Sequence, residues 1–271
     1  MTNLIKTEWL KIKKYPAFWW IIGLTAVSYP GINYMFLKVY ENILGDKGQA
    51  AQLAKLLIGN PFSFPEAWHT VAFFSSIFVF IPAVVVIMLV TNEYSYKTYR
   101  QNIIDGWSRN QFMTAKLIDV LLISLMITIL YITIALVVGF ANTNNALADK
   151  WALSYYAALF FLQTIAQLSI AFLIGFLVRR AFIALGIFIF YFFILENILV
   201  EWARAKANDI GRYLPIEISD RLVPRPAFMS RVNKDAYDKV LTQVNIHIVY
   251  AVLLTTFIWL ICFQINRKRD L

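Results

Sequence analysis

The stretch that decides the fold is LIDVLLISLMITILYITIALVVGF, residues 117–140, in which Asp119 is the only charged side chain. A run of about 20 apolar residues spans the ~30 Å hydrocarbon core of a bilayer as an α-helix. The run lacks the alternation of polar and apolar residues that a membrane β-barrel requires. Since lipid cannot satisfy free backbone groups, helices remain as the way to cross it. The sequence therefore predicts an all-α integral membrane protein.

Similar apolar blocks recur along the chain, which is 60% hydrophobic. A single helix over residues 152–200 would be about 74 Å long, so we expect a turn at Arg179–Arg180. Pro30 and Pro82 should bend the spans that contain them. The predicted architecture is one transmembrane domain over residues 1–271 with six spans, at 17–37, 71–90, 117–141, 152–178, 181–200 and 246–265.

The net charge of +9 is explained by lysines and arginines at the ends of the predicted spans, so we expect the lipid bilayer as a partner and no nucleic acid. With both termini on one side, that side carries 13 Lys and Arg in 50 residues, against 12 in 88 residues on the other side. Basic residues are concentrated on the cytoplasmic side of membrane proteins. We therefore expect both termini to be cytoplasmic.

Two segments outside the spans also have helical patterns. Residues 1–16 place Ile5, Trp9 and Ile12 at helical spacing, which predicts an amphipathic helix on the membrane surface, with a frayed basic tail as the alternative. The loop at 201–245 contains two short helical patterns separated by a segment with three prolines. We expect it to form a helical cap on the outer face, between spans five and six.

The sequence contains no recognisable catalytic or metal-binding cluster. His69 and His247 lack a second histidine or a cysteine at ligand spacing, and Cys262 is the single cysteine. The glycines and lysines near residue 50 do not match a phosphate-binding loop. We expect this chain to be no enzyme, and to hold no cofactor or metal of its own.

Polar residues inside the spans are the next candidates for function. Asp119 lies three residues after Lys116 and should pair with it. Gln163 and Gln167 share one helix face, where they would bond a neighbouring helix or a substrate. Glu196 lies near the end of the fifth span, as a functional group or as an interface carboxylate. Gln163, Gln167 and Glu196 are the candidate residues of a translocation path.

The loop at 92–116, NEYSYKTYRQNIIDGWSRNQFMTAK, is too long for a simple turn between two spans. Glu93, Lys97 and Arg100 have the spacing of one charged helix face. Gly106 is suited to a turn, and Ser108 to the N-cap of a helix that continues into the third span. The pattern predicts a short helix, a turn and a second helix.

This loop resembles the first cytoplasmic loop of the permease subunits of type-2 ATP-binding cassette exporters. That loop has a Glu, a Gly-Thr pair, a Ser-Arg pair and a Lys, whose places are filled here by Glu93, Thr98, Ser108, Arg109 and Lys116. The chain departs from the pattern at Lys97, which replaces the glycine, and it lacks the proline before Ser108. The surface helix, six spans, short inner turn and outer cap also resemble this family.

The resemblance implies a permease that pairs with a second permease copy or paralogue and with two separate ATPase subunits, which would hold ATP and Mg²⁺. It implies a prokaryotic plasma membrane location. The aromatic side chains of the spans separately favour an amphipathic substrate such as a peptide, an antibiotic or a lipid. An ion-coupled secondary transporter and a membrane assembly scaffold are the alternatives, although the spans lack midplane charges. The resemblance assigns ATPase coupling to Glu93, Lys97, Thr98, Arg100, Asp105, Gly106, Ser108, Arg109, Arg179 and Arg180.

Overall fold

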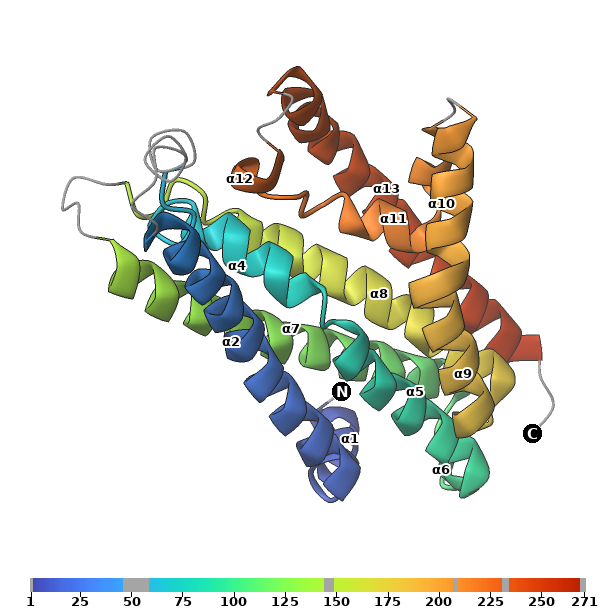
Figure 1. Ribbon diagram of the computed structural model, residues 1–271. Coiled ribbons are helices and arrows are strands. Elements are labelled where there is room, and N and C mark those ends of the chain that lie inside the picture. The colour runs from blue at the N-terminus through green and yellow to red at the C-terminus, as the bar shows by residue number, and fades with distance from the viewer. Residues whose placement is uncertain (1, 46–58, 144–148, 207–208, 231–233, 269–271) are drawn as a thin grey trace.

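The computed structural model describes residues 2–45, 59–143, 149–206, 209–230 and 234–268, and this part of the chain is helical, without strands (Figure 1). The elements, in chain order, are α1 (Thr2–Lys13), α2 (Pro16–Gly45), α4 (Ala67–Ser76), α5 (Phe80–Ser95), α6 (Thr98–Ile104), α7 (Arg109–Asn142), α8 (Tyr156–Val178), α9 (Ala181–Phe190), the π-helix η1 (Tyr191–Leu195), α10 (Glu196–Ala205), the 3-10 helix η2 (Asp209–Tyr213), α11 (Pro215–Asp220), α12 (Ala227–Ser230) and α13 (Lys234–Lys268).

Four of the described helices are long and apolar enough to cross a membrane. They are Arg109–Asn142, Tyr156–Val178, Ala181–Ala205 and Val240–Lys268. The pair α4 and α5 passes the same test if it is taken as one span with a bend of 49°. These helices are compatible with a multi-pass membrane protein, as the apolar blocks of the sequence predicted.

The predicted turn between the fourth and fifth spans is confirmed at Arg179. This residue ends α8 in the left-handed conformation, with φ 59°, and its N–H bonds the carbonyl of Gly175 at 2.9 Å. Pro82 lies in the first turn of α5, just after the 49° bend. Its ring would crowd the carbonyl of Phe78, four residues earlier, in a continuous helix. Pro30, by contrast, lies within the uninterrupted helix α2.

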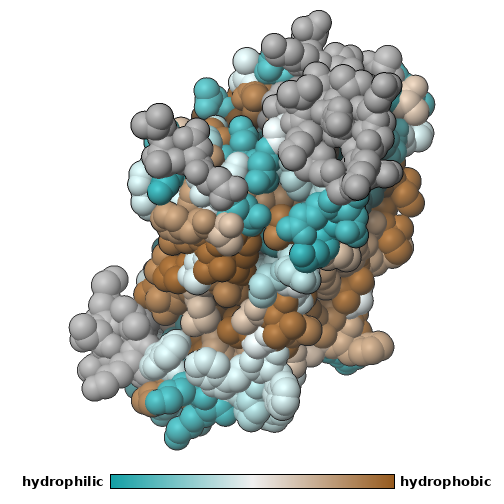
Figure 2. Space-filling view, turned by 60° about the vertical axis from the view of Figure 1, so that its left-hand side comes forward, coloured by the Kyte–Doolittle hydropathy of each residue, from teal (hydrophilic) through white to brown (hydrophobic). Residues whose placement is uncertain are grey.

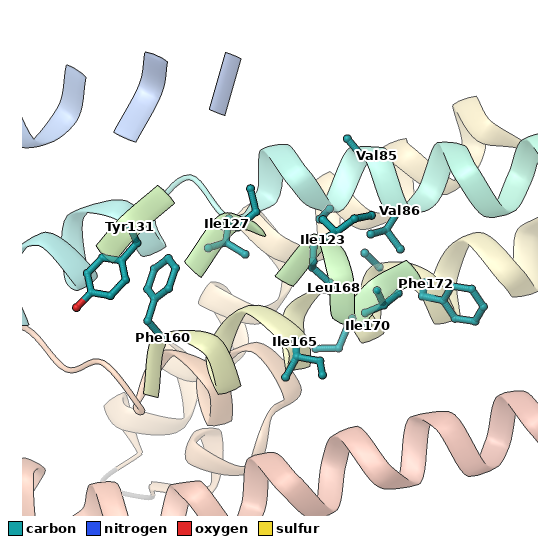
Figure 3. Close-up of a cluster of buried hydrophobic side chains, with 14 of the residues drawn as sticks. Val85, Val86, Ile123, Ile127, Tyr131, Phe160, Ile165, Leu168, Ile170 and Phe172 are labelled. Carbon is teal, nitrogen blue, oxygen red and sulfur yellow. The ribbon is translucent and has the colours of Figure 1, made fainter. Parts of the chain in front are cut away.

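Helix α8 forms the centre of the bundle, between α5, α7 and α13 (Figure 1). Figure 3 shows aliphatic and aromatic side chains of α5, α7 and α8 meeting in one buried cluster. The rings of Tyr131 and Phe160 stack with their centroids 4.6 Å apart. At Gly175 the helices approach so closely that an added Cβ would lie 2.6 Å from Val90 Cγ1. This close approach explains why α5 and α8 pack along their length.

The surface shows the pattern expected of a protein that meets lipid. In the face shown in Figure 2, apolar residues form a band between more polar ends. Exposed apolar residues are frequent on the candidate spans, among them Phe182, Val137 and Leu253. Burial is low for the span Ala181–Ala205, of which 22% of the most apolar window is buried. In water such a surface would be costly, whereas in lipid it is not.

The two helices predicted in the loop at 201–245 are not separate short helices. The second is the first part of α13, which begins at Lys234 and continues into the sixth apolar block. Helix α10 continues the preceding span to Ala205, and η2 follows it as a separate 3-10 turn. Pro215 begins α11, because the first helical position needs no N–H donor. Residues 207–208 and 231–233, which belong to the two predicted helices, lie outside the described residues.

Candidate functional site

The loop between α5 and α7 contains a break that the sequence pattern did not predict. Helix α5 ends at Ser95, and Lys97 adopts the left-handed conformation with φ 59° before α6 begins. The expected single charged face of Glu93, Lys97 and Arg100 is therefore wrong. Glu93 is buried on α5 and points into the protein, whereas Arg100 is exposed on α6. A lysine at the positive-φ position hid the break, because glycine is the usual residue there.

The second half of the loop is as predicted. Gly106 has φ 96°, a conformation that glycine adopts without strain, and turns the chain after α6. The hydroxyl of Ser108 accepts the N–H of Gln111 at 3.2 Å, and the Gln111 side chain accepts the N–H of Ser108 at 2.8 Å. This capping box fixes the start of α7, which runs without a break into the third predicted span.

Helix α6 is held by one face and exposed on the other. Tyr99 is its buried residue and packs edge-on against Phe112 of α7, with ring centroids 4.7 Å apart. Thr98, one of the residues on which the family resemblance rests, donates its hydroxyl hydrogen to the carbonyl of Glu93 at 3.3 Å. Ile104 is 76% exposed, as is Tyr96 just before the helix. The outer face therefore combines apolar and charged groups, including Lys97, Arg100 and Asp105.

Three carboxylates surround the ammonium group of Lys116 in the protein interior. Lys116 Nζ lies 2.7 Å from Glu93 Oε1 and 3.1 Å from Asp119 Oδ2, and it also bonds Glu8 of α1. The four side chains are each at most 8% exposed. Lys11 lies on the surface side of the group, with its Nζ 2.8 Å from Glu8 Oε1 and 3.3 Å from Glu93 Oε1. We call these five residues the ion cluster. The predicted pairing of Lys116 with Asp119 is confirmed as one part of it.

The ion cluster joins the surface helix to the loop. Burial raises the pKa of the Glu8 carboxyl, but the positive charges of Lys116 and Lys11 outweigh this effect and lower it to about 2. The helix predicted within residues 1–16 is confirmed at Thr2–Lys13. The sequence analysis missed Glu8, although a signal was present. Glu8 lies one turn before the buried Ile12, so it falls on the face that packs against the protein. Trp9 instead borders an apolar surface hollow of about 410 Å³ with Leu122. The side chain of Ile5 lies outside the described residues.

The same end of the molecule gathers two further segments. Arg109 donates to the carbonyl of Arg267 at 2.9 Å, and Asn266 donates to the carbonyl of Arg109 at 2.8 Å, which ties the loop to the end of α13. The guanidinium of Arg179 lies 4.7 Å from the centre of the Tyr94 ring, so the turn after α8 packs on α5. Figure 1 shows α1 and α6 at this end of the bundle. Arg180 follows in an extended conformation before α9.

The two glutamines of α8 lie in a different part of the molecule. Gln163 and Gln167 both donate to Asp220 Oδ1 of α11, at 3.0 and 2.8 Å, and Gln167 also donates to the Ser219 hydroxyl at 3.1 Å. Their shared helix face is thus confirmed, with a neighbouring helix as its partner. The contacts of Asp220 could not be predicted from the sequence, because its hydrogen-bond partners Gln163 and Gln167 are more than 50 residues away along the chain.

Glu196 holds the other end of α11. Its Oε1 accepts the backbone N–H of Glu217 at 2.7 Å, a donor in the first turn of that helix. Free N–H groups at a helix N-terminus favour a carboxylate. Glu196 is 3% exposed and thereby ties α10 to α11. The three residues of the predicted path therefore all contact α11, whereas α6, with the candidate coupling residues, lies at the opposite end of the bundle (Figure 1).

In the described part of the chain, no three His, Cys, Asp or Glu side chains are grouped as a metal site. A sequence model of the family described as "Protein of unknown function (DUF2705)" matches residues 58–271. A comparison with curated proteins found no match.

Proposed function

The chain belongs to the DUF2705 family, whose description assigns no activity, and from this premise we propose that it is the permease subunit of an ATP-driven exporter of the type-2 ATP-binding cassette class. Two permease subunits, identical or paralogous, form the path through the membrane. Two separate ATPase subunits bind and hydrolyse ATP on the cytoplasmic side. This chain contributes no ATPase site of its own.

The observation that carries the proposal is the arrangement of α6. This short helix is exposed between two long apolar helices, and the ion pair of Glu93 with Lys116 at 2.7 Å joins the two ends of its loop. The apolar side chain of Ile104 is 76% exposed, so no described part of the chain covers most of it. Seating in a groove of an ATPase subunit would bury it.

The arrangement supports a mechanism of coupling. ATP can drive the permease only if the ATPase binds one permease conformation better than the other. A push on α6 reaches α7 directly, because the capping box at Ser108 makes the loop continuous with that helix. The same push reaches α1 through Glu8 and α13 through Arg109. A displacement of α6 is therefore transmitted to three helices, α7, α1 and α13. Arg179 with Arg180 provides a smaller second contact with the ATPase.

The proposal places six spans in a prokaryotic plasma membrane, with both termini in the cytoplasm. Besides the four apolar helices and the α4–α5 pair, the remaining span is α2, the first in chain order. It is a helix of 30 residues that carries exposed apolar side chains such as Trp20 and Val27. Its aromatic, glycine and polar residues lower its mean hydropathy, so it is not among the four strongly apolar helices. The short helices between α10 and α13 then form the outer cap.

The test is capture of the ATPase by chemically crosslinked membranes that contain the tagged chain, followed by mass spectrometry. The parent chain should capture proteins with an ATP-binding cassette sequence. The variant Arg100→Glu/Ile104→Asp should lose that capture while keeping its membrane insertion, because both side chains are exposed. Lys206→Glu, a charge reversal at the other end of the bundle, is the matched control and should capture normally.

Two results would contradict the proposal. Equal ATPase capture by the Arg100→Glu/Ile104→Asp variant would remove α6 as the coupling element. Transport that continues without ATP and stops when the proton gradient is dissipated would favour an ion-coupled carrier instead. Glu93 is unsuitable for this test, because its removal would disturb the buried ion cluster as well as the loop.

A further inference from the structure

A large cavity lies at the end of the bundle opposite α6. It has a volume of about 900 Å³, is partly open, and is lined by residues of α4, α8, η1, α10, η2, α11, α12 and α13. Cavities of roughly 300–1,000 Å³ hold small organic molecules in proteins. This space is therefore large enough for a ligand, and none of the contacts described so far requires it.

One wall of the cavity is aromatic and apolar. Phe192 and Phe193 come from the π-helix η1, and Phe73 and Ile77 come from α4. A π-turn inside a membrane helix is rare, and such turns are frequent at functional sites. Phe193 is 43% exposed, so its ring is available to a ligand. This wall suits an apolar tail.

The cavity is also lined by charged side chains, most of which are paired with one another. Arg204 contacts Glu201 at 2.6 Å and Glu217 at 3.1 Å. Arg221 contacts Glu217 and Asp209, each at 2.8 Å. These two arginines are thus each held by two carboxylates, which leaves little positive charge for an incoming anion.

Asp220 is the lining carboxylate that these arginines do not neutralise. Within the described residues it has no cationic side chain at ion-pair distance, and its polar contacts are the amides of Gln163 and Gln167, at 3.0 and 2.8 Å. It is surrounded by protein, yet its surface is open because it borders the cavity. A carboxylate in such a position attracts a cation more strongly than one in bulk water.

Two further lining residues keep unused acceptors. Gln163 and His247 are each 1% exposed, and neither Gln163 Oε1 nor His247 Nε2 has a hydrogen-bond partner in the described part of the chain. The Nδ1 of His247 faces the carbonyl of Gln243 at 2.8 Å, so Nδ1 carries the proton and Nε2 is the acceptor. Buried polar atoms without a partner are costly. Both atoms are closed to solvent, so the exposed Asp220, and not these two acceptors, is open to a ligand in the cavity.

We propose that this cavity binds an amphipathic molecule that carries an ammonium group, with Asp220 as its counter-ion and the phenylalanine wall around its apolar part. The proposal rests on the proposed transport function for its physiological meaning, since it names the substrate class of the exporter. Arg225, exposed at the rim, makes an anionic amphiphile the competing ligand.

The experiment measures binding of radiolabelled decylammonium to the purified chain in phosphatidylcholine nanodiscs, with empty nanodiscs subtracted. The parent should show saturable binding that unlabelled decylammonium displaces and decyl sulfate does not. Asp220→Asn should weaken it at least about tenfold, because the amide keeps the size and the contacts with both glutamines but removes the charge. Asp149→Asn, an exposed acid outside the cavity, is the matched control and should bind like the parent.

A second variant tests the apolar wall. Phe193→Ala should weaken decylammonium more than butylammonium, because the shorter chain gains less from the ring. The proposal is overturned if no saturable binding exceeds that of empty nanodiscs, if Asp220→Asn binds like the parent, or if decyl sulfate binds as tightly. Binding is measured without any ATPase. If the chain binds decylammonium but captures no ATPase, the proposed site stands and the permease assignment fails. If it captures an ATPase but does not bind decylammonium, the permease assignment stands and the proposed site fails.

Discussion

Lys116 Nζ lies 2.7 Å from Glu93 Oε1, so the last residue of the 92–116 loop is bonded to one of its first. The pair is buried, and Glu8 and Asp119 complete its surroundings. A buried ion pair is costly to form but fixes the geometry of the groups around it. The loop that carries α6 is consequently a closed unit, anchored on the surface helix and on α7.

Removal of the central cation should destabilise the protein. Lys116→Leu leaves three carboxylates in the interior, which costs roughly 3–5 kcal/mol in comparable buried pairs. We expect a clear fall in the midpoint of thermal unfolding. The unfolding is monitored by size-exclusion chromatography of the detergent-solubilised protein. Lys11→Leu, at the 32% exposed rim of the same ion cluster, should have a small effect. Equal losses in both variants would contradict the central role of Lys116.

The docking of α1 should depend on acid. The Glu8 carboxyl has a pKa of about 2 in the folded protein, because Lys116 and Lys11 outweigh the opposing effect of burial, and 4.5 in an unfolded chain. A lowered pKa stabilises the folded form above about pH 4.5, and this stabilisation is lost as the pH falls toward 2. Pepsin should cleave residues 2–13 increasingly over that range, relative to a free peptide of the same sequence.

The matched variant for this acid test is Glu8→Gln. It removes the titrating group, so its cleavage relative to the free peptide should be high at every pH and should not change between pH 4.5 and 2. A parent chain whose cleavage ratio is flat over the same range would show that Glu8 does not control the docking of α1.

The close contact of α5 with α8 predicts a difference between two glycines. A Cβ at Gly175 would lie 2.6 Å from Val90 Cγ1 and 3.4 Å from Ile87 Cα, so Gly175→Leu must push the helices apart. Overpacking of this kind costs about 1–3 kcal/mol or more. Gly186 on α9 has no atom within 4 Å of such a Cβ. Gly186→Leu should be neutral or slightly stabilising, because leucine favours helix. Thermal unfolding of both variants distinguishes them.

Binding in the cavity should strengthen as the pH rises. The surrounding protein and the negative charges of Glu217 and Glu196 raise the pKa of Asp220 to about 7, although one side of its carboxyl borders the cavity, so a growing fraction of the carboxyl is ionised between pH 6 and 8. Decylammonium affinity should increase over this interval. The charged or titratable neighbours are Glu217 and Arg221 on α11 and in its C-cap, Glu196 on α10 and His247 on α13. Since Asp220→Asn keeps all four, a flat profile in that variant isolates Asp220, and an unchanged rise would assign it to a neighbour.

Much of the secondary structure could be predicted from the sequence, because its causes are local. Apolar runs of membrane length predicted the long helices, and Ser108 and Gly106 predicted the cap and the turn between α6 and α7. The break at Lys97 was missed, since lysine seldom adopts a positive φ and the charge spacing suggested a continuous helix. The candidate coupling residues were found by their order in the loop, whereas their partners were not.

Local patterns were enough to predict that this chain forms long apolar helices and where most of them turn, because helix formation and lipid solvation depend on residues within a few turns of each other. Only the tertiary structure decided which polar groups meet. Glu8 reaches Lys116 across 108 residues, and Gln163 reaches Asp220 across 57. Such pairs form because a buried charge or amide must find a partner, and the packing of whole helices, which no local pattern encodes, selects that partner.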